Sequence, residues 1–274
     1  MSEARQLVQT WDDAARDALE TVRGLEPADF QRSTVLPGWQ VHDVVAHLAH
    51  LEGVCAGFSQ PLGGTVQEVS EEHPEPGIND IARAGVHARR DRTPSDLVEE
   101  LESACAERRA RLAQIDVDDP DAIAIGEFAA LGWPLLGLLR NRPTDLWVHE
   151  QELRMATGLP LRLTGSGADH VAAVLQRAFP MALRRLPAGT TVVLRVTGQR
   201  DLTLAAQMGE DGRAKGVEPP ASTGSSEPSA TLEMSEETWL LLGSGRVAPE
   251  EAEVTVHGDD AVARQVLRQL NVMP

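Results

Sequence analysis

The chain of 274 residues contains no tyrosine, two cysteines and a single lysine, Lys215, against 24 arginines. No apolar run reaches the roughly 18 residues that a membrane-spanning helix needs. The N-terminus lacks the basic start and apolar core of a signal peptide. Cys55 and Cys105 provide neither a disulfide framework nor a zinc knuckle, and their apolar surroundings are typical of small core residues. We therefore expect a cytoplasmic protein without a membrane partner.

The formal net charge of −17 argues against nucleic acid as a partner, because nucleic-acid-binding surfaces are basic. Acidic surfaces of this kind are usually explained by solubility, but they also attract divalent cations. The preference for arginine over lysine, together with the lack of tyrosine, is typical of GC-rich genomes such as those of actinobacteria. This composition carries no information about the fold.

Four segments in the first 160 residues carry apolar side chains at every third or fourth position, which predicts amphipathic helices. They are residues 4–24, 41–58, 94–115 and 135–157. Pro143 lies inside the last segment and predicts a kink or a restart there. Residues 60–80 are rich in glycine, proline and glutamate, and we expect a long loop that could cover a site. Four long helices joined by loops predict a four-helix bundle over residues 1–160.

Residues 161–274 have a different pattern, which predicts an α+β domain with a small, mostly antiparallel sheet. The β-branched run at 190–197 and the alternating run at 201–206 are expected to pair as a hairpin. Further strands are predicted at 230–234 and 253–257, and a flexible loop at 208–228. Helices are predicted at 167–185, 235–243 and 259–270.

The pair Asp145 and His149 is the most informative feature of the chain. A spacing of four residues places a carboxylate and an imidazole on one helix face, one turn apart. A helix can offer two ligands to one metal ion in this way. The same spacing also occurs in ordinary surface pairs, so it does not identify a metal site by itself.

A third ligand is available on the predicted helix 41–58, which carries His42, His47 and His50. If His47 faces Asp145 and His149 across the bundle, the three form a facial site with open positions for a substrate. A histidine in this apolar setting can equally be a core residue. His50 shares part of the face of His47, whereas His42 lies in the first turn, where we expect solvent.

The runs Leu36-Pro-Gly-Trp39, Val41-His-Asp-Val-Val-Ala-His-Leu-Ala49 and Asp145-Leu-Trp-Val-His149 resemble the mycothiol-dependent maleylpyruvate isomerase family. That family belongs to the DinB-like metalloenzyme superfamily. Its members have an N-terminal four-helix bundle and often a C-terminal domain related to sterol carrier proteins. The resemblance implies the same order of domains over nearly the whole chain.

Carried over to this sequence, the resemblance implies metal ligation by His47, Asp145 and His149, with zinc as the expected ion. Position 145 is aspartate, whereas the best-known isomerase has glutamate, so the ligand arm is shorter by one methylene. The resemblance also implies an arginine from the C-terminal domain that holds an anionic substrate, and Arg246 is our candidate. Trp39 and Trp147 flank the ligand segments, and we consider them as walls of a cofactor pocket or as helix packing.

The implied activity is that of a metal-dependent enzyme that uses the small-molecule thiol mycothiol on a small electrophilic substrate. The metal-bound thiolate would attack a conjugated cis double bond in an isomerase, or stay attached to the substrate in an S-transferase. Two alternatives remain: a non-catalytic binding or regulatory module, and a hydrolase that uses metal-bound water. A monomer is the simplest expectation for the oligomeric state.

Overall fold

The computed structural model describes residues 1–61, 78–219 and 227–273. The chain divides into two compact units, Met1–His170 and Val171–Pro274. The sequence placed the boundary near residue 160, whereas this division falls inside helix α8 (Ser166–Ala178). Residues 159–170 belong to the first unit, to which their backbone and side chains form hydrogen bonds. The indole of Trp147 donates to the carbonyl of Arg162 at 2.9 Å, and Ser166 donates to Asp13 at 2.8 Å.

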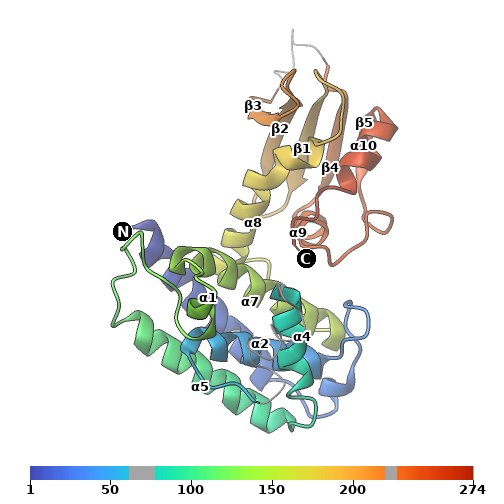
Figure 1. The fold of residues 1–274 in the computed structure, drawn as a ribbon. Helices are drawn as coiled ribbons and strands as arrows, with labels where there is room; N and C mark the ends of the chain where they lie inside the picture. The colour runs from blue at the N-terminus through green and yellow to red at the C-terminus, as the bar shows by residue number, and fades with distance from the viewer. Residues whose placement is uncertain (62–77, 220–226, 274) are drawn as a thin grey trace. The chain divides into compact units, whose positions relative to one another are not determined.

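The first unit is a four-helix bundle, as predicted (Figure 1). Helix α2 packs on α5 and α1 packs on α7, while contacts of α1 with α5 and of α2 with α7 close the bundle. Each helix contributes buried apolar side chains to one core, as ridges packed between helices require. The four helices are α1 (Glu3–Arg23), α2 (Val41–Ala56), α5 (Pro94–Leu112) and α7 (Leu135–Thr157).

The ends of these helices follow the local sequence. Thr93 and Asp96 form a capping box at the start of α5, with Pro94 at the first helical position. Helix α7 ends at Gly158, whose φ of 74° is the left-handed conformation that glycine adopts without strain. Of the kink or restart predicted at Pro143, the restart does not occur, because α7 is assigned as one uninterrupted helix across this proline.

Among the described residues of the first unit, two α-helices were not predicted. They are α4 (Ile78–His87) and α6 (Glu127–Ala130), which pack on α2. Ile81 and Phe128 join Leu51, Val54 and Leu138 in a second apolar cluster. The loop predicted at 60–80 falls mostly on residues 62–77, which lie outside the described residues, and its last positions belong to α4. Both helices are short, and short segments give too few turns for a periodic pattern to be decisive.

The second unit contains a five-stranded sheet of order β3-β2-β1-β4-β5. Its β1–β4 pair is parallel and the other three pairs are antiparallel, which confirms the predicted, mostly antiparallel α+β domain. The strands are β1 (Thr191–Thr197), β2 (Leu202–Met208), β3 (Ala214–Val217), β4 (Ala230–Ser235) and β5 (Thr255–Gly258).

Two predictions for this unit need correction. Residues 214–217 are strand β3 rather than loop, because pairing with β2 compensates for the weak strand propensity of a glycine-containing run. Residues 220–226 of the predicted loop lie outside the described residues. The predicted helix 167–185 is divided into α8 and the 3-10 helix η2 (Phe179–Leu183), where Pro180 lies in the first turn.

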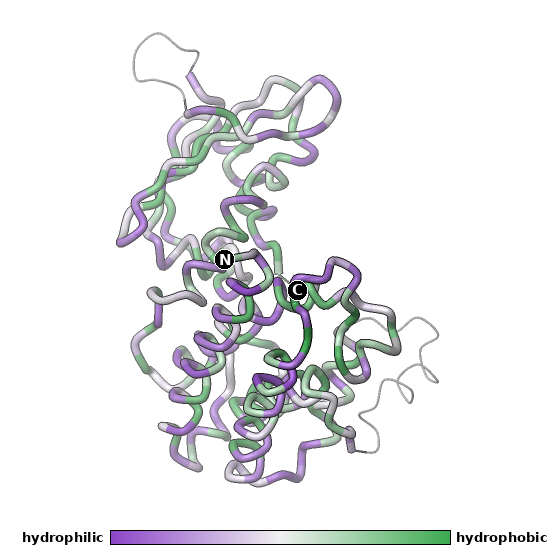
Figure 2. The backbone as a smooth tube through the Cα atoms, turned by 90° about the vertical axis from the view of Figure 1, so that its left-hand side faces the viewer, coloured by the Kyte–Doolittle hydropathy of each residue, from purple (hydrophilic) through white to green (hydrophobic). Residues whose placement is uncertain are grey.

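The remaining helices of the second unit begin where their caps predict. Ser235 caps α9 (Glu236–Gly243) and Asp259 caps α10 (Asp260–Leu267). Hydrophobic and hydrophilic residues alternate along the helices of the chain, as amphipathic packing requires (Figure 2). None of the described helices combines the length and the apolar character needed to cross a bilayer.

Candidate metal centre

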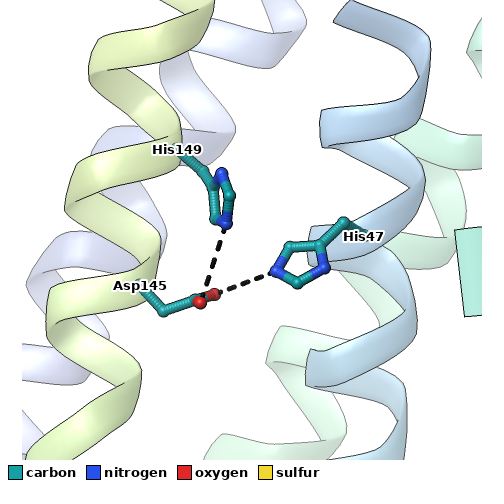
Figure 3. A group of neighbouring side chains, drawn as sticks. All are labelled: His47, Asp145 and His149. Atoms are coloured by element: carbon teal, nitrogen blue, oxygen red, sulfur yellow. Dashed lines mark ion pairs between the residues drawn. The ribbon is translucent and has the colours of Figure 1, made fainter. Parts of the chain in front are cut away.

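His47 of α2 and the pair Asp145 and His149 of α7 point toward one another inside the bundle (Figure 3). The Nε2 atom of His47 lies 3.4 Å from Oδ2 of Asp145, and Nε2 of His149 lies 3.7 Å from Oδ1. One potential ligand atom from each residue lies within 4.8 Å of the others. Tetrahedral zinc with ligand bonds near 2.1 Å separates its ligand atoms by about 3.4 Å, so these spacings fit a divalent ion.

The packing of α2 decides which of its three histidines joins this group. His42, in the first turn, contacts the carbonyl of Arg92 at 2.9 Å. His50 is fully buried and contacts the side chains of Gln60 at 2.8 Å and Arg89 at 3.2 Å. His47 is therefore the histidine of α2 that faces α7.

Burial and the neighbouring charges shift the pKa values of His47 and Asp145 in directions that favour binding of a cation. Burial lowers the pKa of His47, with a further contribution from His149, so its imidazole stays neutral and keeps a lone pair at neutral pH. Burial opposes the ionisation of Asp145, but the Arg142 guanidinium and the two imidazoles outweigh it and hold the pKa of this carboxyl well below its usual range. The group therefore offers a neutral imidazole from His47, a carboxylate from Asp145 and a second imidazole from His149.

Unsatisfied polar atoms also fit a metal ion at this place. Among the described residues, the ring nitrogens of His47 and Oδ2 of Asp145 lack hydrogen bonds of good geometry, although Oδ2 forms ion pairs with Arg142 at 2.8 Å and with His47 at 3.4 Å. Buried polar atoms without partners are costly, and a cation between them would satisfy Nε2 of His47 and the carboxylate together. The donor set is one that zinc and similar ions accept.

Two further side chains of α7 contact the proposed ligands. Nη1 of Arg142 lies 2.8 Å from Oδ2 of Asp145, three residues further along the helix. Oε2 of Glu152 lies 2.6 Å from Nδ1 of His149, again three residues away. Both supporting side chains are buried. Sequence reasoning missed them, although the three-residue spacing puts each on the same helix face as its ligand.

A buried ionic cluster connects Asp145 to all four helices of the bundle. Glu52 of α2 is completely buried and accepts from Trp11 of α1 at 3.0 Å, Arg108 of α5 at 2.6 Å and Arg142 of α7 at 3.0 Å. Burial opposes ionisation of Glu52, but the two guanidiniums lower its pKa below the usual value. The two acids and two arginines alternate and balance in charge. No local pattern in the sequence indicates this cluster, because its members come from four helices.

The two tryptophans considered as pocket walls have different surroundings. The ring of Trp39 lies parallel to that of His149, with centroids 6.5 Å apart, and edge-on to that of His47 at 5.6 Å. Trp147 is buried, bonded to the carbonyl of Arg162 and packed beside Gly167. The structure thus places Trp39 next to the ligand group and Trp147 in helix packing, because residues two apart on a helix point in different directions.

Arg246 belongs to the second unit, just after α9. Its guanidinium donates to the carbonyl of Ser244, and its backbone N–H donates to the carbonyl of Leu241 at 2.8 Å. These contacts fix the turn that follows α9. A role for Arg246 toward a substrate stays a prediction.

The chain combines a four-helix bundle, which holds an inward-facing His/Asp/His group, with an α+β unit that follows it. It is therefore a two-unit protein with a candidate metal centre in its helical bundle. Residues 11–154 match the family model of the mycothiol maleylpyruvate isomerase N-terminal domain, which covers more than half of the chain. The chain therefore belongs to this family, in agreement with the resemblance seen in its motifs.

Two solved structures have the same fold. They are a mycothiol-dependent maleylpyruvate isomerase, with a TM-score of 0.56, and a histidine-to-alanine mutant of such an isomerase, with a TM-score of 0.57. Both are 14% identical to this chain, and the alignment covers 93% of each chain. A search of curated proteins finds no match.

Proposed function

We propose that this protein is a divalent-metal-dependent enzyme that uses mycothiol as its thiol, with His47, Asp145 and His149 as the metal ligands. The observation that carries the proposal is the convergence of these three side chains inside the bundle, with one potential ligand atom of each within 4.8 Å of the others. Family membership and the likeness to two structures of mycothiol-dependent isomerases support mycothiol as the thiol. The substrate class is a small electrophile, acted on by cis–trans isomerisation of the maleylpyruvate type or by S-transfer.

A divalent ion held by these ligands would lower the pKa of a coordinated thiol, so that a thiolate is available at neutral pH. The chain's residues supply the rest. His47 offers a neutral nitrogen, Asp145 offers one negative charge, and Arg142 holds that carboxylate in place. His149 offers a second imidazole nitrogen. Trp39 lies beside the two imidazoles and is proposed as an apolar wall of the site. Arg246 is proposed to bind the substrate's anionic group.

In the isomerase reaction, the thiolate sulfur adds to one carbon of the conjugated cis double bond, and the electron pair moves onto the conjugated carbonyl. Rotation about the new single bond and return of the electron pair expel the thiolate and leave the trans product. In the transferase reaction the carbon–sulfur bond stays, and the carbanion equivalent takes up a proton. Both reactions need the same thiolate, so the site chemistry alone is compatible with either.

The first test is the metal content of the purified protein, measured by elemental analysis. We expect near-stoichiometric zinc or another divalent ion in the wild type. Asp145→Ala, His47→Ala and His149→Ala should each lose this metal, because each removes one of three ligands. His87→Ala changes an exposed histidine of α4 and serves as the matched control, with metal content unchanged. Circular dichroism should show that all four variants remain folded.

Activity separates the remaining possibilities. We expect turnover of an activated cis-alkene or electrophile that requires added mycothiol and is lost in His47→Ala and His149→Ala. Turnover of an activated ester without any thiol would favour a hydrolase. If the wild type holds no metal after zinc is supplied, the proposal fails, and a non-catalytic binding module becomes the better interpretation.

A further inference from the structure

A second buried carboxylate lies behind the ligand group. Glu152 is completely buried on α7, and its Oε2 contacts Nδ1 of His149 at 2.6 Å. This nitrogen is the one that does not face Asp145, since the Nε2 atom of His149 lies 3.7 Å from the Asp145 carboxylate. The two nitrogens of one imidazole thus contact two different carboxylates on the same helix.

The contact between Glu152 and Nδ1 bears on the tautomer of the His149 ring. A carboxylate can only accept a hydrogen bond, so with Glu152 as a carboxylate and His149 as a neutral imidazole this contact requires the ring proton on Nδ1. The lone pair is then on Nε2, directed at the place where the three ligand atoms converge. A carboxylate behind a ligating histidine fixes the orientation of the ring and makes its ligating nitrogen more basic.

We propose that Glu152 is a positioning residue of the candidate metal centre, which holds His149 in the Nδ1–H tautomer and strengthens its bond to the metal. This inference rests on the proposed function and adds a residue that does not itself touch the metal.

The same helix provides a matched control. Glu150 lies two residues before Glu152 and is equally buried. Its carboxylate is paired with Thr21 at 2.9 Å, Arg154 at 2.8 Å and Arg162 at 2.9 Å, all away from the ligand group. Glu150→Gln therefore removes a buried charge from α7 without changing the surroundings of His149.

The test compares Zn²⁺ affinity, measured by competition with a chromophoric chelator, in full-length wild type, Glu152→Gln, Glu152→Leu and Glu150→Gln. We expect Zn²⁺ affinity to fall about 10-fold in Glu152→Gln, which keeps an acceptor but loses the charge. The fall should approach about 100-fold in Glu152→Leu, which loses both. Glu150→Gln should bind Zn²⁺ as the wild type does, even if its unfolding temperature falls. Wild-type affinity in both Glu152 variants would overturn the inference.

The tautomer of His149 can be measured without metal. A purely structural role of Glu152 would leave this tautomer unchanged. Long-range ¹H–¹⁵N spectra distinguish Nδ1–H from Nε2–H imidazoles, and the His149 signals are identified by their loss in His149→Asn. We expect the Nδ1–H form in metal-free wild type and in Glu150→Gln, and a shift toward Nε2–H in Glu152→Leu. An unchanged tautomer in Glu152→Leu would refute the positioning role. Failure of wild type to bind Zn²⁺ would instead refute the proposed function, and the tautomer result would still decide this inference.

Discussion

At the scale of single residues, His47 and His50 show how the neighbours of a histidine determine its chemistry. They lie three residues apart on α2, and both are buried. His47 faces the carboxylate of Asp145, whereas His50 faces the guanidinium of Arg89, which is itself paired with Glu100 at 2.6 Å. Burial, reinforced by Arg89, lowers the pKa of His50 to about 3. His50 is therefore neutral in the folded protein across the whole physiological range.

This depressed pKa predicts a loss of stability in acid. An unfolded histidine binds a proton near pH 6.5, whereas folded His50 does so only near pH 3. Between these values the unfolded chain binds more protons, so stability falls as the pH falls below 6.5. Between pH 7 and pH 5, we expect the wild type to lose about 2 kcal/mol more unfolding free energy than His50→Gln. Urea denaturation at both pH values measures this difference, and equal losses in the two proteins would contradict the assignment.

At the scale of elements, the short helix α4 lies unusually close to α2. The contact is made at Gly85, where an added Cβ atom would lie 2.0 Å from Cδ2 of His50. The His50 ring cannot move aside, because it is buried and bonded to Gln60 and Arg89. A glycine is needed here for close approach of two helices rather than for an unusual backbone angle.

Gly85→Ala should therefore destabilise the protein by about 1–3 kcal/mol, the usual cost of overpacking a core. Gly137 of α7 is the matched control, since nothing lies within 4 Å of an added Cβ atom there. Gly137→Ala should stabilise by about 0.5–1 kcal/mol, because alanine loses less backbone entropy in a helix. Chemical denaturation of both variants measures the contrast. Equal stability of the two would show that α4 does not pack on His50 in this way.

At the scale of the whole molecule, the proposed ligands, Arg142, Glu152 and the Glu52 cluster all belong to residues 1–170. A ligand that binds the native state stabilises the unit that contains its site. Metal binding should therefore stabilise the bundle and not the α+β unit.

Differential scanning calorimetry of the full chain tests this expectation. Zn²⁺ at about 100 times its Kd should stabilise the bundle by about 2.7 kcal/mol and raise the temperature of one transition. The transition of the α+β unit should stay in place, and Asp145→Ala should abolish the Zn²⁺ effect. A single transition that moves as a whole would contradict separate unfolding of the two units.

Much of the architecture could be predicted because apolar residues repeat along the sequence with the period of a helix or of a strand. Apolar spacing, the Thr93–Asp96 cap and the glycine at 158 located the helices of the bundle. The pairing of Asp145 with His149 followed from helix geometry, since residues four apart lie on one face. These features are local, so the chain determined them before any packing was known.

Only the tertiary structure decided which helix faces meet. The choice of His47 over His42 and His50, the position of Trp39 beside the ligands, and the packing of Trp147 against Gly167 depend on how α2 and α7 are set against their neighbours. The Glu52 cluster and helix α4 likewise depend on contacts between residues far apart in the chain. The helical period determines which side chains share one face of a helix. The free energy of burying apolar faces against one another determines which faces meet across the bundle.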